Sequence, residues 1–170
     1  MKLNEVKIGE TFKIAGVEFV KVTEGEEITA ITKDALFNSS FGDNSNFAES
    51  KIRTRLEAEL LPKLEAEIGA ENIIELETDM LAFDGTRPFP NFRSKVSLTT
   101  LDFYRQHRSV FEAHKLGIWW WLATPDSKKY KNVILCVSPR GDVIGDSYNC
   151  DDGVRPVLRF VSSISVSCEG

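Results

Sequence analysis

The sequence predicts a loop-rich α+β protein. Two observations lead to this prediction: short stretches of alternating polar and apolar residues occupy both ends of the chain, and one long helical pattern lies between them. With 170 residues, of which 42% are hydrophobic and 10% aromatic, the chain can bury a sizeable core without metals or disulfides. We therefore expect antiparallel sheets, one main helix and a short second helix in a single domain over residues 1–170.

The N-terminal part of the chain has the pattern of three strands. Glu10–Ile14 and Val17–Val22 alternate polar and apolar residues around Ala15–Gly16, which predicts a hairpin with a tight turn. Ile28–Thr32 follows a charged turn and predicts a third strand. Asp34–Ser45 is rich in Asn, Ser, Gly and Asp, so we expect a loop there.

The main helix is expected to begin at a capping box over Asn46–Glu49. Apolar residues then recur at helical spacing from Ile52 to Ile68, with charged residues on the other face. Pro62 lies inside this pattern and is expected to kink the helix or to start a second one. Gly69 is expected to end it.

The second half of the chain is predicted to return to strands. A helix capped by Thr99 or Thr100 is expected from Leu101 to about Val110. The segments expected to be strands are Asn72–Glu77, Val96–Leu98, Trp119–Ala123, Asn132–Val137 and Val154–Val161. A turn at Ser138–Asp142 should return the chain through Val143–Ile144.

Three consecutive tryptophans are expected to help build the core. Strand geometry places Trp119 and Trp121 on one face and Trp120 on the other, and at least two of them should be buried. Arg155 is expected to be held by a carboxylate or by backbone carbonyls. The residues predicted to be mostly buried on these strands are Trp119, Trp121, Val133, Leu135, Val154 and Leu158.

Charge and cysteine usage restrict the partners and the compartment. Lys and Arg number 21 against 26 Asp and Glu, and a net charge of −5 argues against nucleic acid as a partner. We expect no signal peptide, and the longest apolar run, Leu116–Ala123, is too short to cross a bilayer. The odd number of cysteines suggests reduced thiols, in the cytoplasm or in a phage particle assembled there. A Cys136–Cys150 bridge is left open as the less favoured alternative.

The C-terminal strands carry a family resemblance. Trp119–Pro125 (WWWLATP) and Gly153–Leu158 (GVRPVL) resemble the WWLRSP…GVRPAL signature of an uncharacterised bacterial and prophage domain family. Ala48–Leu56 is similar to its S-x-IR-x-WL helix, and Val96–Tyr104 to its VFLLSxEEY segment, in the same order. Ala123–Thr124 stands where the family usually has Arg-Ser.

That family in turn resembles the C-type-lectin-like fold, which includes formylglycine-generating enzymes and the variable proteins of diversity-generating retroelements. The resemblance implies that the N-terminal hairpin and the C-terminal strand Val154–Val161 share one sheet. It also implies that the main helix packs on this sheet through Ile52, Leu56 and Leu60.

Catalytic constellations are weak. The sequence contains no Gly-rich phosphate loop and no nucleophile elbow, and the spacing around His107 and His114 does not predict a zinc site. Cys136 and Cys150 do not match the closely spaced cysteine pair of the oxidases. Four acids, Asp142, Asp146, Asp151 and Asp152, could collect a hard cation, but solvated loop acids are the favoured interpretation. We therefore expect no metal and no cofactor, and a non-enzymatic role is favoured although the enzyme class stays open.

The polar stretch Gly145–Asp152 is the candidate binding surface. Its Tyr, Ser and Asn side chains combine contact area with adaptable hydrogen bonding. The candidate ligand-binding residues, expected to be exposed and to form one face, are Arg140, Asp142, Ser147, Tyr148, Asn149, Asp151 and Asp152. The expected function is a ligand- or protein-binding module, with a prophage as one source and a protein or small polar ligand as partner. An oxidase relative with an altered site and a structural phage subunit remain alternatives, and the oligomeric state is open.

Overall fold

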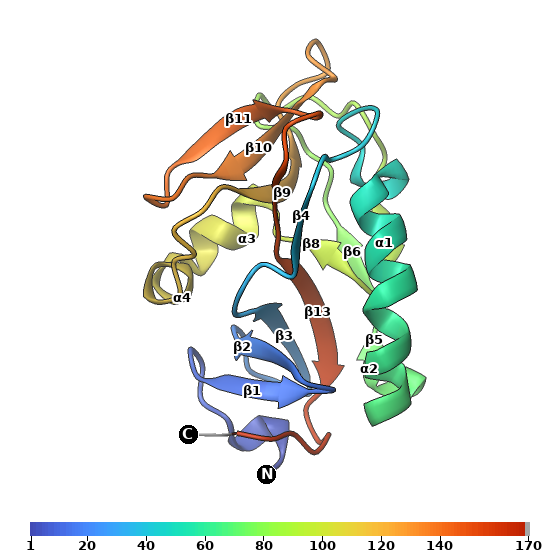
Figure 1. Cartoon of the computed structure of the whole chain (residues 1–170), viewed down its shortest axis with the longest axis vertical. Coiled ribbons are helices and arrows are strands. Elements are labelled where there is room, and N and C mark those ends of the chain that lie inside the picture. Colours follow the sequence, from blue (N-terminus) through green and yellow to red (C-terminus); the bar gives the residue numbers. More distant parts are fainter. Residues whose placement is uncertain (169–170) are drawn as a thin grey trace.

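The computed structural model describes residues 1–168 as two sheets arranged along the long axis of the molecule (Figure 1). The first sheet contains six strands: β1 (Thr11–Ile14), β2 (Val17–Lys21), β3 (Glu27–Thr32), β13 (Pro156–Val161), β5 (Ile73–Ile74) and, paired with β13 beside this path, β8 (Ser97–Leu98). The second contains five strands, in the order β11 (Val143–Ser147), β10 (Val133–Val137), β9 (Trp120–Pro125), β12 (Asp152–Val154) and β4 (Phe37–Ser39). A separate pair is formed by β6 (Leu76–Thr78) and β7 (Phe92–Ser94).

The two ends of the chain share the first sheet, as expected. β13 pairs with β3 from Val157↔Ile31 to Val161↔Glu27, and the hairpin β1–β2 joins the sheet through β3. Beyond the strands, Lys2 pairs with Ser165. The ladders of the described residues are antiparallel except that of β12 with β9, where Gly153 pairs with Trp120 in parallel. The five-stranded sheet is therefore mixed, whereas the pairings in the other two sheets are antiparallel.

The main helical segment is broken where Pro62 predicted a break. α1 (Lys51–Glu59) ends at Leu60, and Pro62 lies in the first turn of α2 (Leu61–Ile68), where its missing N–H costs no hydrogen bond. The positions that face the sheets, Ile52, Leu56, Leu60 and Leu64, are all buried in one cluster with Leu158 and Phe160 of β13. Packing through Ile52, Leu56 and Leu60 is thus confirmed.

The start of this helix differs from the expected capping box. Asn46 caps a short 3₁₀ helix, Phe47–Glu49, by accepting a hydrogen bond from the N–H of Ala48. Ser50 then caps α1 by accepting a bond from the N–H of Arg53 at 3.0 Å. The side chain of Glu49 contacts Asn44 instead of turning back to Asn46, so two successive caps replace one.

The second predicted helix is also two helices. α3 (Leu101–Gln106) and α4 (Arg108–Ala113) meet at His107, whose backbone leaves the helical region. Thr100 caps α3, as one of the two expected caps. Two more short 3₁₀ helices are Leu3–Glu5 and Ala70–Asn72. No helix of residues 1–168 is long and apolar enough to span a membrane.

Three segments differ from the predicted strands, because their pairing partners lie far away in the chain. The predicted loop Asp34–Ser45 contains β4, which pairs with β12. The predicted strand Asn72–Glu77 is divided between β5 and β6, which lie in different sheets. The predicted strand Val154–Val161 is likewise divided between β12 and β13, with Arg155 at the junction.

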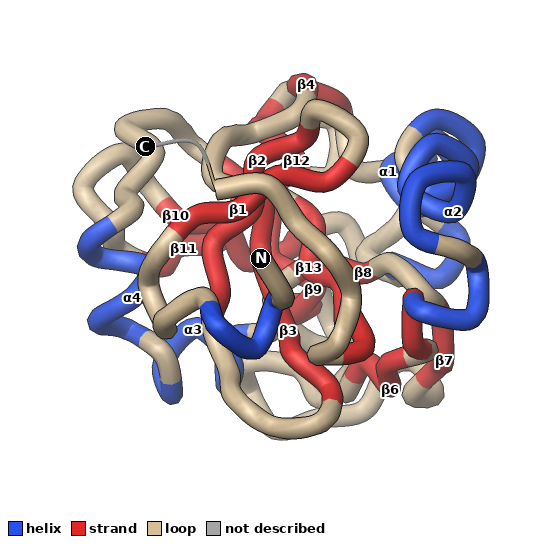
Figure 2. The backbone as a smooth tube through the Cα atoms, turned by 90° about the horizontal axis from the view of Figure 1, so that it is seen from below, coloured by secondary structure: helices blue, strands red, loops and turns tan. Residues whose placement is uncertain are grey.

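The core lies on both sides of β9. Trp121 packs in a large cluster with the main helix, and Trp120 packs in a second cluster with Phe111 of α4. Figure 2 shows α1 and α2 on one flank of the strands and α3 and α4 on the other.

Burial of Trp121, Leu135, Val154 and Leu158 is confirmed. Trp119, at 41% exposed, was expected in the core incorrectly, because it precedes β9. Val133, which begins β10, is half-buried.

Arg155 connects the two sheets from a fully buried position. Its Nε donates to the carbonyl oxygen of Thr32 at 2.7 Å, and its Nη2 donates to those of Lys33 at 3.0 Å and His114 at 3.1 Å. Its guanidinium lies 5.3 Å from the centroid of the Trp120 ring. Burial lowers the pKa of Arg155 to about 10, so the side chain remains a cation at neutral pH. The expectation that carbonyls hold this arginine is confirmed.

The different environments of two neighbouring tryptophans predict different effects on stability. Trp121 is fully buried, donates from Nε1 to the carbonyl oxygen of Ser39 at 2.9 Å and contacts the ring of Phe41. Trp121→Ala should lower the free energy of unfolding by about 3–5 kcal/mol, and Trp119→Ala by less than about 1 kcal/mol. Urea denaturation of both variants measures this, and equal losses would contradict the described packing.

Candidate functional site

The candidate binding residues lie at opposite ends of β11. Arg140 and Asp142 are exposed in the turn before the strand, whereas Ser147 is its last residue and Asn149 and Asp151 are exposed beyond it. The register Val137↔Val143 to Val133↔Ser147 places the whole length of the hairpin between the two groups. The expectation that they form one face is therefore wrong, because a regular hairpin separates them.

Three of the residues predicted to be exposed, Ser147, Tyr148 and Asp152, are half-buried or buried. Asp152 is only 7% exposed, since it pairs with Ser39 in the ladder of β12 with β4. Tyr148 is half-buried against the main core cluster, and its carbonyl oxygen accepts from the N–H of Phe41 at 2.8 Å. Residues 37–41, expected to be a loop, thus cover this part of the polar stretch.

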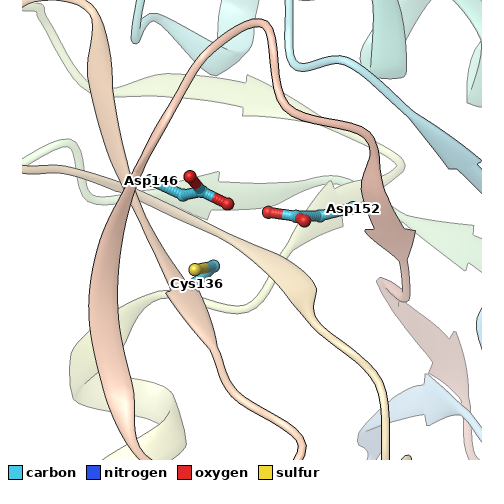
Figure 3. A group of neighbouring side chains, drawn as sticks. All are labelled: Cys136, Asp146 and Asp152. Carbon is cyan, nitrogen blue, oxygen red and sulfur yellow. The ribbon is translucent and has the colours of Figure 1, made fainter.

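Asp152 instead belongs to a cluster with Asp146 and Cys136 (Figure 3). One ligand-type atom from each residue lies within 4.8 Å of the other two. Figure 3 shows the two carboxyl groups pointing toward each other beside the thiol. Cys136 pairs with Ile144, two residues before Asp146, so Cys136 and Asp146 share one face of the hairpin. β12 brings Asp152 to the same place from the far side of β9.

The electrostatics of this cluster are unusual for acids. Burial, followed by a hydrogen bond and charge repulsion from Asp146, raises the pKa of Asp152 to about 7, and Asp151 adds to this. The Oδ2 atom of Asp152 is buried without a hydrogen-bond partner. Because no basic group contributes to this shift, a proton or a bound cation is what would neutralise the pair.

The thiols beside the acids are free and poorly nucleophilic. Burial and the nearby acids raise the pKa of Cys136 to about 12. A hydrogen bond to Asp146 is the main cause that raises the pKa of Cys150, and no disulfide joins the two residues. Since the thiolate is the nucleophile, this environment does not favour thiol-based turnover. The cluster is suited to holding a proton or a metal ion.

A groove lies on the opposite face of the same hairpin. Its volume is about 490 Å³, and its apolar lining includes Leu101, Leu135 and Val143. Phe83, which is 62% exposed, lines both this groove and a second hollow of about 360 Å³ beside α3. Phe83 was not predicted as a site residue, although the apolar run from Met80 to Phe83 outside any predicted element was a signal.

β11 forms the free edge of its sheet along this groove. The N–H of Tyr148 donates to the carbonyl oxygen of Asn132 at 2.8 Å, which identifies the hydrogen-bonded pairs of the hairpin. By alternation, Ile144 and Asp146 bond to β10, whereas Val143 and Gly145 direct their backbone N–H and C=O groups away from it.

The two histidines occupy the C-cap positions of two helices. His107 ends α3, and His114 ends α4 with its Nε2 at 2.7 Å from the carbonyl oxygen of Gly9.

Comparison of the chain with protein-family models, curated proteins and solved structures found no match. The groove and the acid–thiol cluster are therefore the observations from which a function can be argued.

The raised pKa of Asp152 predicts that this group lowers the stability of the folded protein as pH rises, whereas a carboxyl group with a lowered pKa would do the opposite. The folded protein holds a proton on Asp152 up to about pH 7, whereas the unfolded chain releases it near pH ~4. The stabilisation from this group is therefore complete below about pH 4 and is lost as pH rises to about 7, by at most about 1.4 kcal/mol per pH unit. Asp152→Asn should lack this loss.

Urea denaturation with EDTA present, at pH 4.5 and at pH 7.5, measures the effect. The free energy of unfolding of the Asp152→Asn variant should rise relative to the unmodified protein between the two pH values. Asp142→Asn, at an exposed position in the turn at the other end of the hairpin, is the matched control and should follow the unmodified protein. A parallel pH response of the Asp152 variant and the unmodified protein would contradict the buried acid pair.

Proposed function

We propose that this chain is a non-enzymatic protein-binding module of C-type-lectin-like architecture that receives an extended peptide segment along β11. The observation that carries the proposal is a free edge strand bordering an apolar groove. An added strand would satisfy the unpaired backbone groups of Val143 and Gly145, and its alternate side chains would enter the groove. Affinity would come from the backbone bonds and specificity from the side chains.

The lining of the groove indicates the chemistry of the peptide. Phe83 is a large hydrophobic residue and is 62% exposed, so covering it removes apolar surface from water. Arg105 and Arg108 also line the groove, and both keep substantial exposure beside their intramolecular acids. A strand with alternating apolar residues and one acidic residue fits this combination of surfaces.

The residues first predicted for binding would take a secondary place in this proposal. Arg140 and Asp142 precede the edge strand, and Ser147, Asn149 and Asp151 follow or end it. They would form the polar rim at the two ends of the peptide, where exposed side chains adjust hydrogen bonds. Tyr148 and Asp152 would not contact the peptide, because Tyr148 is half-buried and Asp152 is buried.

Two features of the chain support the lectin-like architecture within this proposal. The N-terminal strands and the C-terminal strand share one sheet, as that fold requires. The signature segments form β9, β12 and β13, which carry buried residues of both core clusters. The raised pKa of Cys136 disfavours the oxidase alternative, which needs a reactive thiol.

Hydrogen exchange within the edge strand tests the proposal. Random nine-residue peptides displayed on phage would be selected against the immobilised protein, and the best binder synthesised. The amides of Val143 and Gly145 should exchange rapidly in the free protein and slow at least tenfold with peptide bound. The amides of Ile144 and Asp146 are internal controls, because β10 already protects them.

A surface variant separates the groove from other apolar sites. Phe83→Glu should weaken peptide binding by tenfold or more, since it places a charge against the apolar lining. Ile8→Glu changes a comparably exposed residue outside the groove and should leave binding unchanged. Selected peptides that bind equally well to the Phe83 variant, or that leave Val143 and Gly145 unprotected, would overturn the proposal. Self-association through β11 would support the phage-subunit alternative instead.

A further inference from the structure

We propose that the inner face of the β10–β11 hairpin binds one zinc ion, with four ligands: Cys136, Asp146, Cys150 and Asp152. The site does not depend on the peptide groove, which lies on the opposite face of the hairpin. Three of the ligands come from different strands, β10, β11 and β12, and the fourth from the segment between β11 and β12.

The first argument is the geometry of the three clustered atoms. The Sγ of Cys136 and one carboxylate oxygen each from Asp146 and Asp152 lie within 4.8 Å of one another. Ligand atoms of a tetrahedral zinc ion with ordinary Zn–S and Zn–O bonds lie about 3.3–3.8 Å apart. Side-chain rotations that close these gaps by about 1 Å would complete three corners of the tetrahedron.

The second argument is independent of the clustering. Asp152 is 7% exposed, and its Oδ2 is buried without any hydrogen-bond partner. Figure 3 shows its carboxyl group directed at Asp146 and Cys136. A buried oxygen that lacks a donor costs stability unless something occupies the space in front of it. A cation bound by the three side chains would satisfy that oxygen.

Cys150 supplies the fourth ligand. Its side chain interacts with Asp146 and is near enough to Cys136 to raise the pKa of that thiol, so it adjoins the cluster. It is half-buried in the short segment that follows β11, which leaves a route for the ion to enter. Two thiols and two carboxylates favour zinc over calcium or magnesium, which take oxygen ligands. Binding would release both thiol protons, and any proton on Asp152, to solvent.

Zinc titration of the reduced, EDTA-treated protein tests the site. Competition with a chromophoric chelator should give one zinc per chain. Cys150→Ser and Asp152→Asn should each weaken the affinity by roughly a hundredfold or more, since even indirect changes around metal ligands cost 10–100-fold. Cys168→Ser and Asp142→Asn are matched controls at exposed positions away from the cluster and should bind zinc normally.

Cobalt gives a second readout that identifies the ligands. Substituted cobalt should show thiolate charge-transfer absorption, which weakens in the Cys150→Ser variant and is lost when Cys136 is also replaced by Ser. Circular dichroism of Cys150→Ser checks that a half-buried loop substitution leaves the fold intact. Zinc affinity equal in all variants, absence of zinc binding by the reduced folded protein, or cobalt bound without thiolate absorption would each overturn the proposal.

Discussion

The guanidinium of Arg155 is the constraint on which the rest of the structure depends. A fully buried cation needs hydrogen-bond acceptors, and here these are the carbonyl oxygens of Thr32, Lys33 and His114. These carbonyls lie at the ends of β3 and α4, so one side chain holds the first sheet, the α3–α4 flank and the β12–β13 junction together. Its Nη1 has no hydrogen-bond partner, and the ring of Trp120 at 5.3 Å supplies part of its remaining environment.

The same junction creates the acid–thiol cluster. Because the chain changes sheets at Arg155, β12 runs beside β9, with the N–H of Gly153 donating to the carbonyl oxygen of Trp119 at 2.8 Å. A side chain at Gly153 would meet that oxygen at 3.1 Å and the end of the Ile118 side chain at 2.9 Å, so the close approach favours glycine. The preceding residue, Asp152, lies on β12, and its side chain reaches Cys136 and Asp146 of the β10–β11 hairpin, which lies on the other side of β9.

The β10–β11 hairpin therefore has two faces with different chemistry. One faces the cluster of Cys136, Asp146 and Asp152, and the other borders an apolar groove that includes Leu135 and Val143. Gly145 lies on the edge strand between them, with its backbone toward the free edge. Zinc bound on the inner face would tie β10, β11 and β12 together. An edge strand made rigid in this way loses less entropy when a peptide pairs with it.

Local patterns determined much of the architecture: the N-terminal hairpin, the helix broken near Pro62 and the burial of Trp121 follow from period, turn residues and the missing proline N–H. The tertiary structure decided the rest, including the pairing of β4, the division of Val154–Val161 between two sheets and the burial of Asp152. The seven candidate binding residues were chosen by composition, and the structure divides them between the two ends of β11. Cys136 and Phe83 were not recognised as site residues. The reason is physical: strand pairing and desolvation depend on partners far apart in the chain, and no local pattern encodes which strand lies beside which.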